Sequence, residues 1–221
     1  MEPTWNAVDE YFNQRLRLSD DALSAALADS TAAGLPAINV TPAQGKLLML
    51  LARMCQAGRI LEVGTLGGYS AIWMGRALPG DGALITLEIN PVNAAVAQRN
   101  LERAGLAERV EVIVAPATES LNRLIADRVQ PFDLVFIDAD KERSVEYFDA
   151  ALALSHPGTV IIVDNVVREG AIIDAQSTDA NVQGMRRLTE HVARERRVSV
   201  TAIQTVGSKG YDGFILGVVT T

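Results

Sequence analysis

The sequence predicts an α/β protein with a doubly wound, mostly parallel sheet, a helical preface and a C-terminal antiparallel hairpin. Three observations support this. Apolar residues recur at helical spacing up to about residue 56, short apolar runs then alternate with helical stretches, and the last two apolar runs flank a short glycine-containing loop. Such alternation requires right-handed crossovers between parallel strands. The 221 residues are most simply one domain (1–221), with a preface over 1–56 and a Rossmann-like core over 57–221.

The preface is expected to be helical from residue 4 to about residue 56. Apolar residues recur at helical spacing between Val8 and Leu16. The segment Ser19-Asp20-Asp21 resembles a helix start, and Gly34-Leu35-Pro36 breaks the pattern. Thr41-Pro42 then begins a further helix, with proline in its first turn. These helices could pack on a partner or cover an active site.

The core alternates strands with helices. Strand-like runs are expected at 59–63, 84–88, 110–114, 132–138 and 159–164. Helices are expected at 69–78, 91–105, 118–129, 142–155 and near 180–196. The hairpin is expected from strands at 198–203 and 214–219, with a glycine-containing loop at 207–210.

Composition narrows the class of function. The net charge of −7 disfavours nucleic acid as a partner, because an acidic surface repels phosphates. Arginines cluster at 186–187 and 194–197, but we interpret these clusters as the solvated face of a helix. No apolar run approaches the ~18 residues of a membrane span, and the first residues do not resemble a secretory signal. The single Cys55 excludes an internal disulfide and suits a reducing compartment. We therefore expect a soluble, cytoplasmic protein.

Two acidic motifs follow apolar runs, Ile137–Lys141 and Val163–Asn165. A carboxylate after a buried parallel strand lies at the carboxyl edge of the sheet, where open α/β folds bind ligands. If the two strands are neighbours, Asp138 and Asp164 lie about 5 Å apart and repel each other unless a cation or proton lies between them. Asn165 adds a neutral oxygen. Such oxygen ligands favour a hard divalent cation, Mg²⁺ or another such as Ca²⁺ or Mn²⁺, over zinc.

A glycine-rich turn, 64–68, follows the first strand and lets a ligand approach the backbone. Its spacing is not the dinucleotide pattern G-x-G-x-x-G, and the carboxylate of Glu62 before it suits a positively charged ligand. Glu88 ends the second strand roughly 20 to 25 positions further on, where an acid binds ribose hydroxyls. These features predict a nucleoside-containing ligand.

Four motifs together resemble the cation-dependent O-methyltransferases, a family that includes catechol O-methyltransferase, plant caffeoyl-CoA O-methyltransferase and many bacterial relatives. They are Glu62–Ser70 with its glycines, Glu88-Ile89-Asn90, Ile137–Lys141 and Asp164-Asn165-Val166. The resemblance covers the chain from about Val40 to Val219. It implies S-adenosylmethionine as methyl donor, on the seven-stranded sheet with a reversed final hairpin that class I methyltransferases share.

The resemblance also implies roles for individual residues. The methionine end of the donor would be lined by Glu62, Gly64, Thr65, Tyr69 and Ser70, and covered by Val40. Asp138 would also bind the cofactor. Glu88 would hold the ribose, and the backbone of Ala117 would meet the adenine, although Ala115 stands where relatives commonly have glycine. The metal ligands would be Asp138, Asp164 and Asn165, and the general base Lys141.

Five other assignments follow. Lys141 is either that base or a surface lysine at a helix start, and the base is favoured. Asp140 is expected to cap the following helix rather than support the metal. Asp212 is equally well a turn residue or a substrate contact. His156 and His191 have no acidic or nucleophilic partner nearby in sequence and are interpreted as structural.

Several functions compete with methyl transfer to a small molecule. A nucleotide-linked oxidoreductase would use a similar sheet, a non-catalytic binding protein would keep the fold, and RNA or protein would be other methyl acceptors. The missing dinucleotide pattern and the acidic metal motifs count against the oxidoreductase. The intact acidic motifs also count against a non-catalytic protein, and the negative net charge counts against RNA as the acceptor. We expect a small ortho-dihydroxy aromatic as the acceptor, and a homodimer from the family resemblance.

Overall fold

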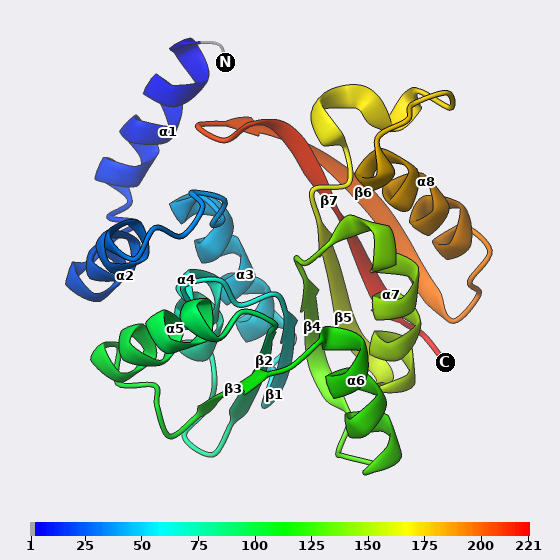
Figure 1. Ribbon diagram of the computed structural model, residues 1–221, viewed down its shortest axis with the longest axis horizontal. Coiled ribbons are helices and arrows are strands. Elements are labelled where there is room, and N and C mark those ends of the chain that lie inside the picture. The colour runs from blue at the N-terminus through cyan, green and yellow to red at the C-terminus, as the bar shows by residue number, and fades with distance from the viewer. Residues whose placement is uncertain (1–2) are drawn as a thin grey trace.

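A seven-stranded sheet forms the centre of the computed structural model, which describes residues 3–221 (Figure 1). The strand order is β3-β2-β1-β4-β5-β7-β6. The strands are β1 (Arg59–Val63), β2 (Ala83–Glu88), β3 (Val110–Val114), β4 (Phe132–Ile137), β5 (Ser155–Asp164), β6 (Val198–Gly207) and β7 (Gly210–Val219). Met1 and Glu2, which begin the predicted preface, lie outside the described residues.

The pairing of the strands confirms the predicted topology. Strands β1 to β5 pair in parallel, and β7 runs antiparallel to both β5 and β6. The chain winds outward in one direction from β1 to β3 and in the other from β4 to β5. The order therefore reverses between β1 and β4, and a crevice opens at their carboxyl ends, where such folds bind ligands.

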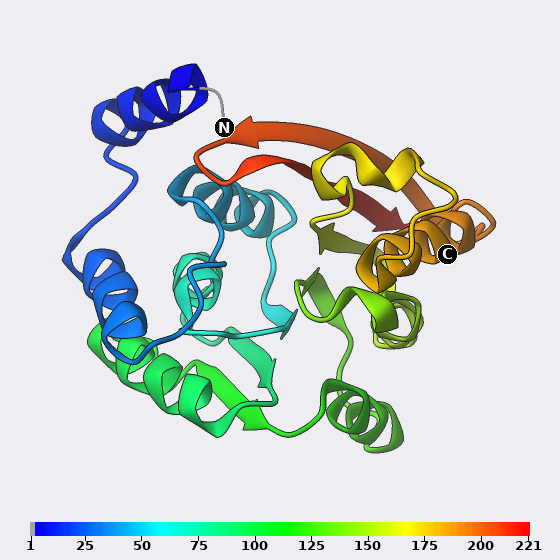
Figure 2. The same ribbon diagram turned by 45° about the horizontal axis from the view of Figure 1, so that its top comes forward.

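Helices cover both faces of the sheet (Figures 1 and 2). The α-helices are α1 (Pro3–Arg15), α2 (Asp21–Ala32), α3 (Pro42–Met54), α4 (Tyr69–Gly75), α5 (Pro91–Arg103), α6 (Ala117–Ala126), α7 (Ser144–Ala153) and α8 (Ala180–Val192). Two 3-10 segments, η1 (Lys141–Arg143) and η2 (Arg168–Ile173), follow β4 and β5. None of the helices within residues 3–221 has the length and apolar character needed to cross a membrane.

The sheet separates two apolar cores. Along β4, Leu134 and Phe136 join the core under α2 to α5, whereas Val135 and Ile137 join the core under α6 to α8. This alternation is the two-residue period of a strand. Because both faces are buried, the strand is apolar from Leu134 to Ile137, and the first polar position after this run is Asp138.

The helix starts agree with the sequence signals. The Asp20 carboxylate accepts from the Leu23 N–H at 3.0 Å, and the Thr41 hydroxyl accepts from the Gln44 N–H at 3.1 Å. Each satisfies a backbone donor that the first helical turn leaves unpaired.

The hairpin is longer than the sequence indicated. Its turn takes only Ser208 and Lys209, so β6 and β7 pair over their full length and extend beyond the rest of the sheet. The tip reaches α1 (Figure 2), where the Ser208 N–H donates to the Asp9 carboxylate at 2.7 Å. Asp9 is distant in sequence, so apolar patterning could not reveal this contact.

Candidate active site

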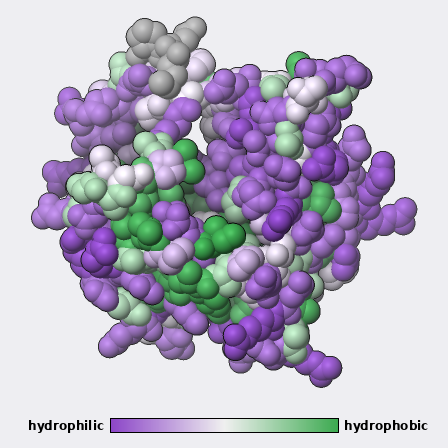
Figure 3. All heavy atoms as spheres, in the orientation of Figure 1, coloured by the Kyte–Doolittle hydropathy of each residue, from purple (hydrophilic) through white to green (hydrophobic). Residues whose placement is uncertain are grey.

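A cavity of about 700 Å³ lies at the carboxyl ends of β1, β2 and β4. In the space-filling view, hydrophobic residues gather in the hollowed middle of this face, with hydrophilic residues around them (Figure 3). Eight of the nine residues predicted to bind the cofactor line the cavity: Val40, Gly64, Thr65, Tyr69, Ser70, Glu88, Ala117 and Asp138. The structure thus brings together residues that span almost 100 positions of the chain.

The first glycine of the turn after β1 is required by its contact with β4. Gly64 has φ +103°, and a Cβ there would lie 2.1 Å from the Asp138 carbonyl oxygen. Any other residue would push the end of β1 away from the end of β4. Gly64 therefore lets the predicted cofactor-binding turn and the acidic motif share one wall of the cavity.

Glu62 is the ninth predicted residue, and it lies behind the wall rather than on it. Its side chain is fully buried; Ser70 Oγ donates to one carboxyl oxygen at 2.5 Å, and Thr86 Oγ1 to the other at 2.6 Å. Burial raises the pKa of Glu62 to about 8, although the two hydroxyls oppose the shift. Glu62 orients Ser70 on the cavity wall, and its contact with a cofactor stays a prediction.

Glu88 presents a fixed carboxylate to the cavity. The backbone N–H groups of Leu66 and Asn90 each donate to it at 2.8 Å, one to each oxygen. An ionised carboxylate has about four lone-pair positions, so acceptor capacity remains for hydroxyl groups. Ala117 begins α6 beside Pro116, and both residues line the cavity.

The two predicted metal-binding acids follow neighbouring strands. Ile137 of β4 pairs with Val163 of β5, so Asp138 and Asp164 lie side by side. Lys141 is 7% exposed, and its Nζ lies 2.8 Å from Asp138 Oδ1. The main chain of Lys141 is fixed by α8, because a Cβ on Gly184 would lie 2.2 Å from the Lys141 carbonyl oxygen.

Asp164 is 3% exposed, and burial, followed by the charge of Asp138, raises its pKa; Lys141 counteracts this. Its Oδ1 accepts from the Asn165 N–H at 2.9 Å, and its Oδ2 from Gln44 Nε2 at 2.6 Å. Sequence reasoning missed Gln44, because the glutamine lies 120 positions from its partner. No local signal identifies that contact.

Asn165 lies where two cavities meet. Its φ of 57° is left-handed, and it lines both the large cavity and a second one of about 260 Å³. The second cavity also contacts Gln44 and Asp164, together with α1 and the β6–β7 hairpin. The acidic pair therefore separates the predicted cofactor cavity from a smaller space that is close to the hairpin.

The donor set fits a hard divalent cation. Two carboxylates and an amide supply oxygen ligands. The charge of Asp138 disfavours ionisation of the buried Asp164, so the pair favours positive charge beside it. Across residues 3–221 no group of three or more His, Cys, Asp or Glu side chains is arranged to hold a metal ion. The candidate set thus depends on the Asn165 amide.

The predicted cap by Asp140 is wrong. Its carboxylate makes no capping hydrogen bond to η1 and instead accepts from the Tyr147 hydroxyl at 2.5 Å. Both residues line the large cavity. The η1 segment and the first turn of α7 lie between the two residues, so the carboxylate of Asp140 bonds to the tyrosine hydroxyl in place of the backbone N–H groups of η1.

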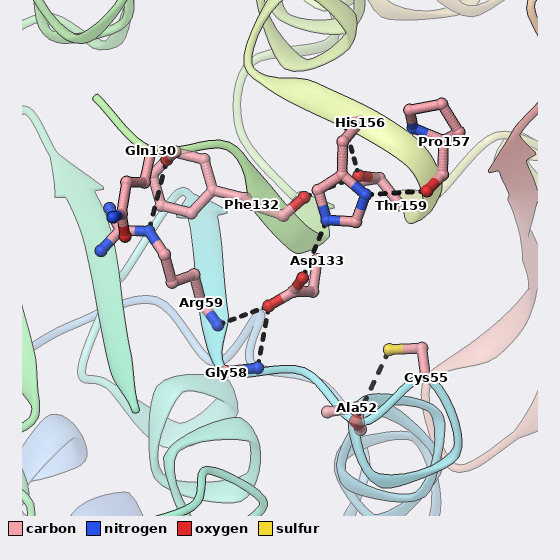
Figure 4. A network of polar contacts seen from close by, with 10 residues as sticks. All are labelled: Ala52, Cys55, Gly58, Arg59, Gln130, Phe132, Asp133, His156, Pro157 and Thr159. Atoms are coloured by element: carbon pink, nitrogen blue, oxygen red, sulfur yellow. Dashed lines mark hydrogen bonds and ion pairs between the residues drawn. The ribbon is translucent and has the colours of Figure 1, made fainter. Parts of the chain in front are cut away.

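Both histidines have acidic partners, which sequence proximity did not show. His156 Nε2 lies 2.9 Å from Asp133 Oδ1, and His191 Nε2 lies 2.7 Å from Asp149 Oδ1. Asp133 also accepts from two backbone N–H groups at 2.8 Å, those of Gly58 and Arg59 (Figure 4). This network joins the starts of β1, β4 and β5, at the edge of the sheet opposite the cavity. It supports the structural interpretation of His156.

Asp212 holds a loop. Its Oδ1 accepts from the backbone N–H groups of Val167, Arg168 and Gly213 at 2.9, 3.0 and 2.9 Å. Of the two predicted roles for Asp212, turn residue and substrate contact, these contacts support the turn residue. By fixing the segment after Asn165, Asp212 acts on the site through the backbone.

Known proteins resemble this chain over its whole length. A sequence model of the O-methyltransferase family matches residues 19–216. The catechol O-methyltransferase of Niastella koreensis is 50% identical over 215 residues, which cover 97% of each chain.

Solved structures agree with this assignment. An O-methyltransferase from Bacillus cereus, in complex with SAH, has a TM-score of 0.98 and 53% identity, with 100% of both chains covered. An O-methyltransferase from Streptomyces achromogenes involved in tomaymycin synthesis, in complex with SAM, has a TM-score of 0.96 and 50% identity, again over 100% of both chains. The predicted fold class is confirmed, and the chain belongs to the O-methyltransferase family.

Proposed function

We propose that this O-methyltransferase uses S-adenosylmethionine and a divalent cation to methylate one hydroxyl of an ortho-dihydroxy aromatic molecule. The observation that carries the proposal is the set Asp138, Asp164 and Asn165, beside the buried Lys141, where two cavities meet. Relatives named catechol O-methyltransferase support the acceptor class, and relatives solved with SAM or SAH support the donor.

The large cavity offers the contacts that the donor needs. Glu88, fixed by two backbone N–H groups, suits the ribose hydroxyls. Ala117 would meet the adenine through its backbone, and the turn at Gly64, with Val40, would surround the methionine end. In support, all three residues line the cavity. Apolar residues on the cavity wall, among them Ile38, Leu66 and Ile89, would exclude water from the reacting groups.

Asp138, Asp164 and Asn165 would hold Mg²⁺, Ca²⁺ or Mn²⁺. When bound, such an ion lowers the pKa of a chelated hydroxyl and fixes its orientation. The hydroxyl proton passes to Lys141 Nζ, which must be neutral at that moment. A new O–CH₃ bond then forms as the S–CH₃ bond breaks. Since opposite charges cancel in this step, the side chains chiefly orient the partners.

The acceptor class is tested by methyl transfer to catechol, resorcinol and phenol at one Mg²⁺ concentration. These three differ in whether a second hydroxyl is adjacent to the first. We expect efficient transfer to catechol alone, because only vicinal hydroxyls chelate one ion. Equal turnover of resorcinol and catechol would contradict the proposal.

The expected homodimer stays a prediction. Large apolar side chains are exposed on α1, with Tyr11 57% and Phe12 48% accessible. A second copy of the chain would cover such residues. Sedimentation of the purified protein at several concentrations tests this, and a monomer throughout would refute it.

A further inference from the structure

Arg168 is a half-buried cation at the rim of the large cavity, and the chain does not neutralise it. It lines the cavity together with Arg143 and Asn181. Its Nε is buried and has no hydrogen-bond partner. Within residues 3–221, Arg168 forms no ion pair with a carboxylate. Buried donors are nearly always hydrogen-bonded in working proteins, so the side chain of Arg168 lacks the partners that would fix it within the chain.

The nearby acids are engaged elsewhere. The charge of Arg168 contributes to the lowered pKa of Asp179, but the larger causes are the Asn181 and Val182 N–H groups that this acid caps at the start of α8. Asp140 accepts from Tyr147. The positive charge of Arg168 is thus available at the rim.

The backbone holds Arg168 in an uncommon conformation beside the acidic set. Arg168 has φ 55° and Glu169 has φ 56°, both left-handed. A non-glycine residue in this region is strained, and strain of this kind collects at ligand sites. The Asp212 carboxylate fixes the loop by accepting the Arg168 N–H at 3.0 Å. Only two residues separate Arg168 from Asn165, so a molecule at the acidic set lies close to the arginine.

Arg143 adds a second guanidinium to the same rim. Its ion pair with Asp140 is long, at 3.9 Å, and both side chains are more than half exposed, so this pair is weak. Lys141, by contrast, is tied to Asp138 at 2.8 Å. Because the chain carries a net charge of −7, a local pair of arginines is what would draw an anion to this cavity.

We propose that Arg168, assisted by Arg143, binds a carboxylate of the methyl acceptor, so that the preferred acceptors are ortho-dihydroxy aromatic acids rather than uncharged catechols. The proposal rests on the proposed function. Arginine suits a carboxylate because its planar fork donates two parallel hydrogen bonds. The donor's own carboxylate is the competing source of this chemistry. It is assigned to the β1 side of the cavity, whereas Arg168 follows β5.

The test compares 3,4-dihydroxybenzoate with its methyl ester, which keeps the two hydroxyls and removes the charge. In the wild type we expect kcat/KM to favour the acid. Arg168→Gln should lower kcat/KM for the acid roughly tenfold to hundredfold, as expected for a lost charged hydrogen bond, and change the ester less than about twofold. Arg168→Lys should restore part of the preference. Arg123→Gln, an exposed arginine on α6, is the matched control and should behave as wild type.

Two outcomes would overturn the inference. One is an equal loss for acid and ester in Arg168→Gln, which indicates a structural role. The other is a weakened Kd for S-adenosylmethionine, measured by calorimetry, which assigns Arg168 to the donor.

Binding separates this inference from the proposed function. Calorimetry of acid and ester against the wild type, loaded with S-adenosylhomocysteine and Mg²⁺, needs no turnover. If the wild type binds the acid more tightly than the ester, and Arg168→Gln does not, the carboxylate site is supported even when neither compound is methylated. Absence of methylation would then refute the proposed function alone. Equal binding of acid and ester refutes the carboxylate site whatever the activity.

Discussion

Replacing Glu62 with glutamine should make the stability of the protein less dependent on pH. Glutamine keeps the shape of the side chain, and the hydroxyls of Ser70 and Thr86 can each donate or accept a hydrogen bond, so both contacts survive. What the substitution removes is a buried group that titrates. In the wild type, burial raises its pKa from 4.5 to about 8.

The size of the effect follows from linkage. The folded protein holds the Glu62 proton more tightly than the unfolded chain, so the contribution to stability is fully present below pH 4.5 and is lost as the pH rises towards 8. Within this window, each rise of one pH unit lowers the free energy of unfolding by about 1.4 kcal/mol. The free energy of unfolding of the wild type should therefore fall, relative to Glu62→Gln, by roughly 2–3 kcal/mol between pH 5 and pH 7.

Urea unfolding of both proteins without ligands, at pH 5, 6, 7 and 8, measures this difference. The comparison cancels the titration of all groups that the two proteins share. Glu102→Gln, which removes an exposed carboxylate from α5, controls for the loss of one acid and should follow the wild type. A difference between wild type and Glu62→Gln that stays constant from pH 5 to pH 8 would refute the reasoning, because it would mean that Glu62 is ionised throughout.

Three further predictions concern other parts of the fold. Gly64→Ala should abolish donor binding in calorimetry and lower the melting temperature, because its Cβ would lie 2.1 Å from the Asp138 carbonyl oxygen; a variant that binds normally would contradict this. The Pro157 carbonyl and then the Asp133 carboxylate raise the pKa of His156, so its stabilisation is present below pH 6.5 and is lost as the pH rises through the folded pKa. His156→Gln should thus cost more stability at pH 6 than at pH 9 in urea unfolding, and an equal cost would refute it. Asp212→Ala leaves three backbone N–H groups without their acceptor and should cost about 2–3 kcal/mol and raise KM for the acceptor; an unchanged KM would show that the loop is held otherwise.

The sequence predicted the features that depend on local pattern. Buried parallel strands are apolar runs, so the first acid after such a run marks the carboxyl edge of the sheet. This rule located Asp138 and Asp164, and the pairing of β4 with β5 made them neighbours. The glycine turn was also predicted from local pattern, because its conformation depends on the glycines within it.

The sequence could not predict contacts between distant segments. Gln44 reaches Asp164 across 120 positions, and Asp133 meets His156 only because β4 and β5 begin side by side. The capping prediction for Asp140 failed for a related reason. Propensity favours a cap there, but a tyrosine hydroxyl on the next helix offered a competing partner. The hairpin tip likewise meets Asp9 of α1, which is 199 positions away in sequence.

The role of the acidic set is tested most directly by methyl transfer from S-adenosylmethionine to catechol, in Mg²⁺, in EDTA, and after Mg²⁺ is restored. The wild type should lose turnover in EDTA and regain it with Mg²⁺. Asp164→Asn, which keeps the shape of the side chain and removes its charge, should remain inactive throughout while it still binds the donor. Turnover that survives EDTA, or an Asp164→Asn variant as active as the wild type, would contradict a divalent cation at this site.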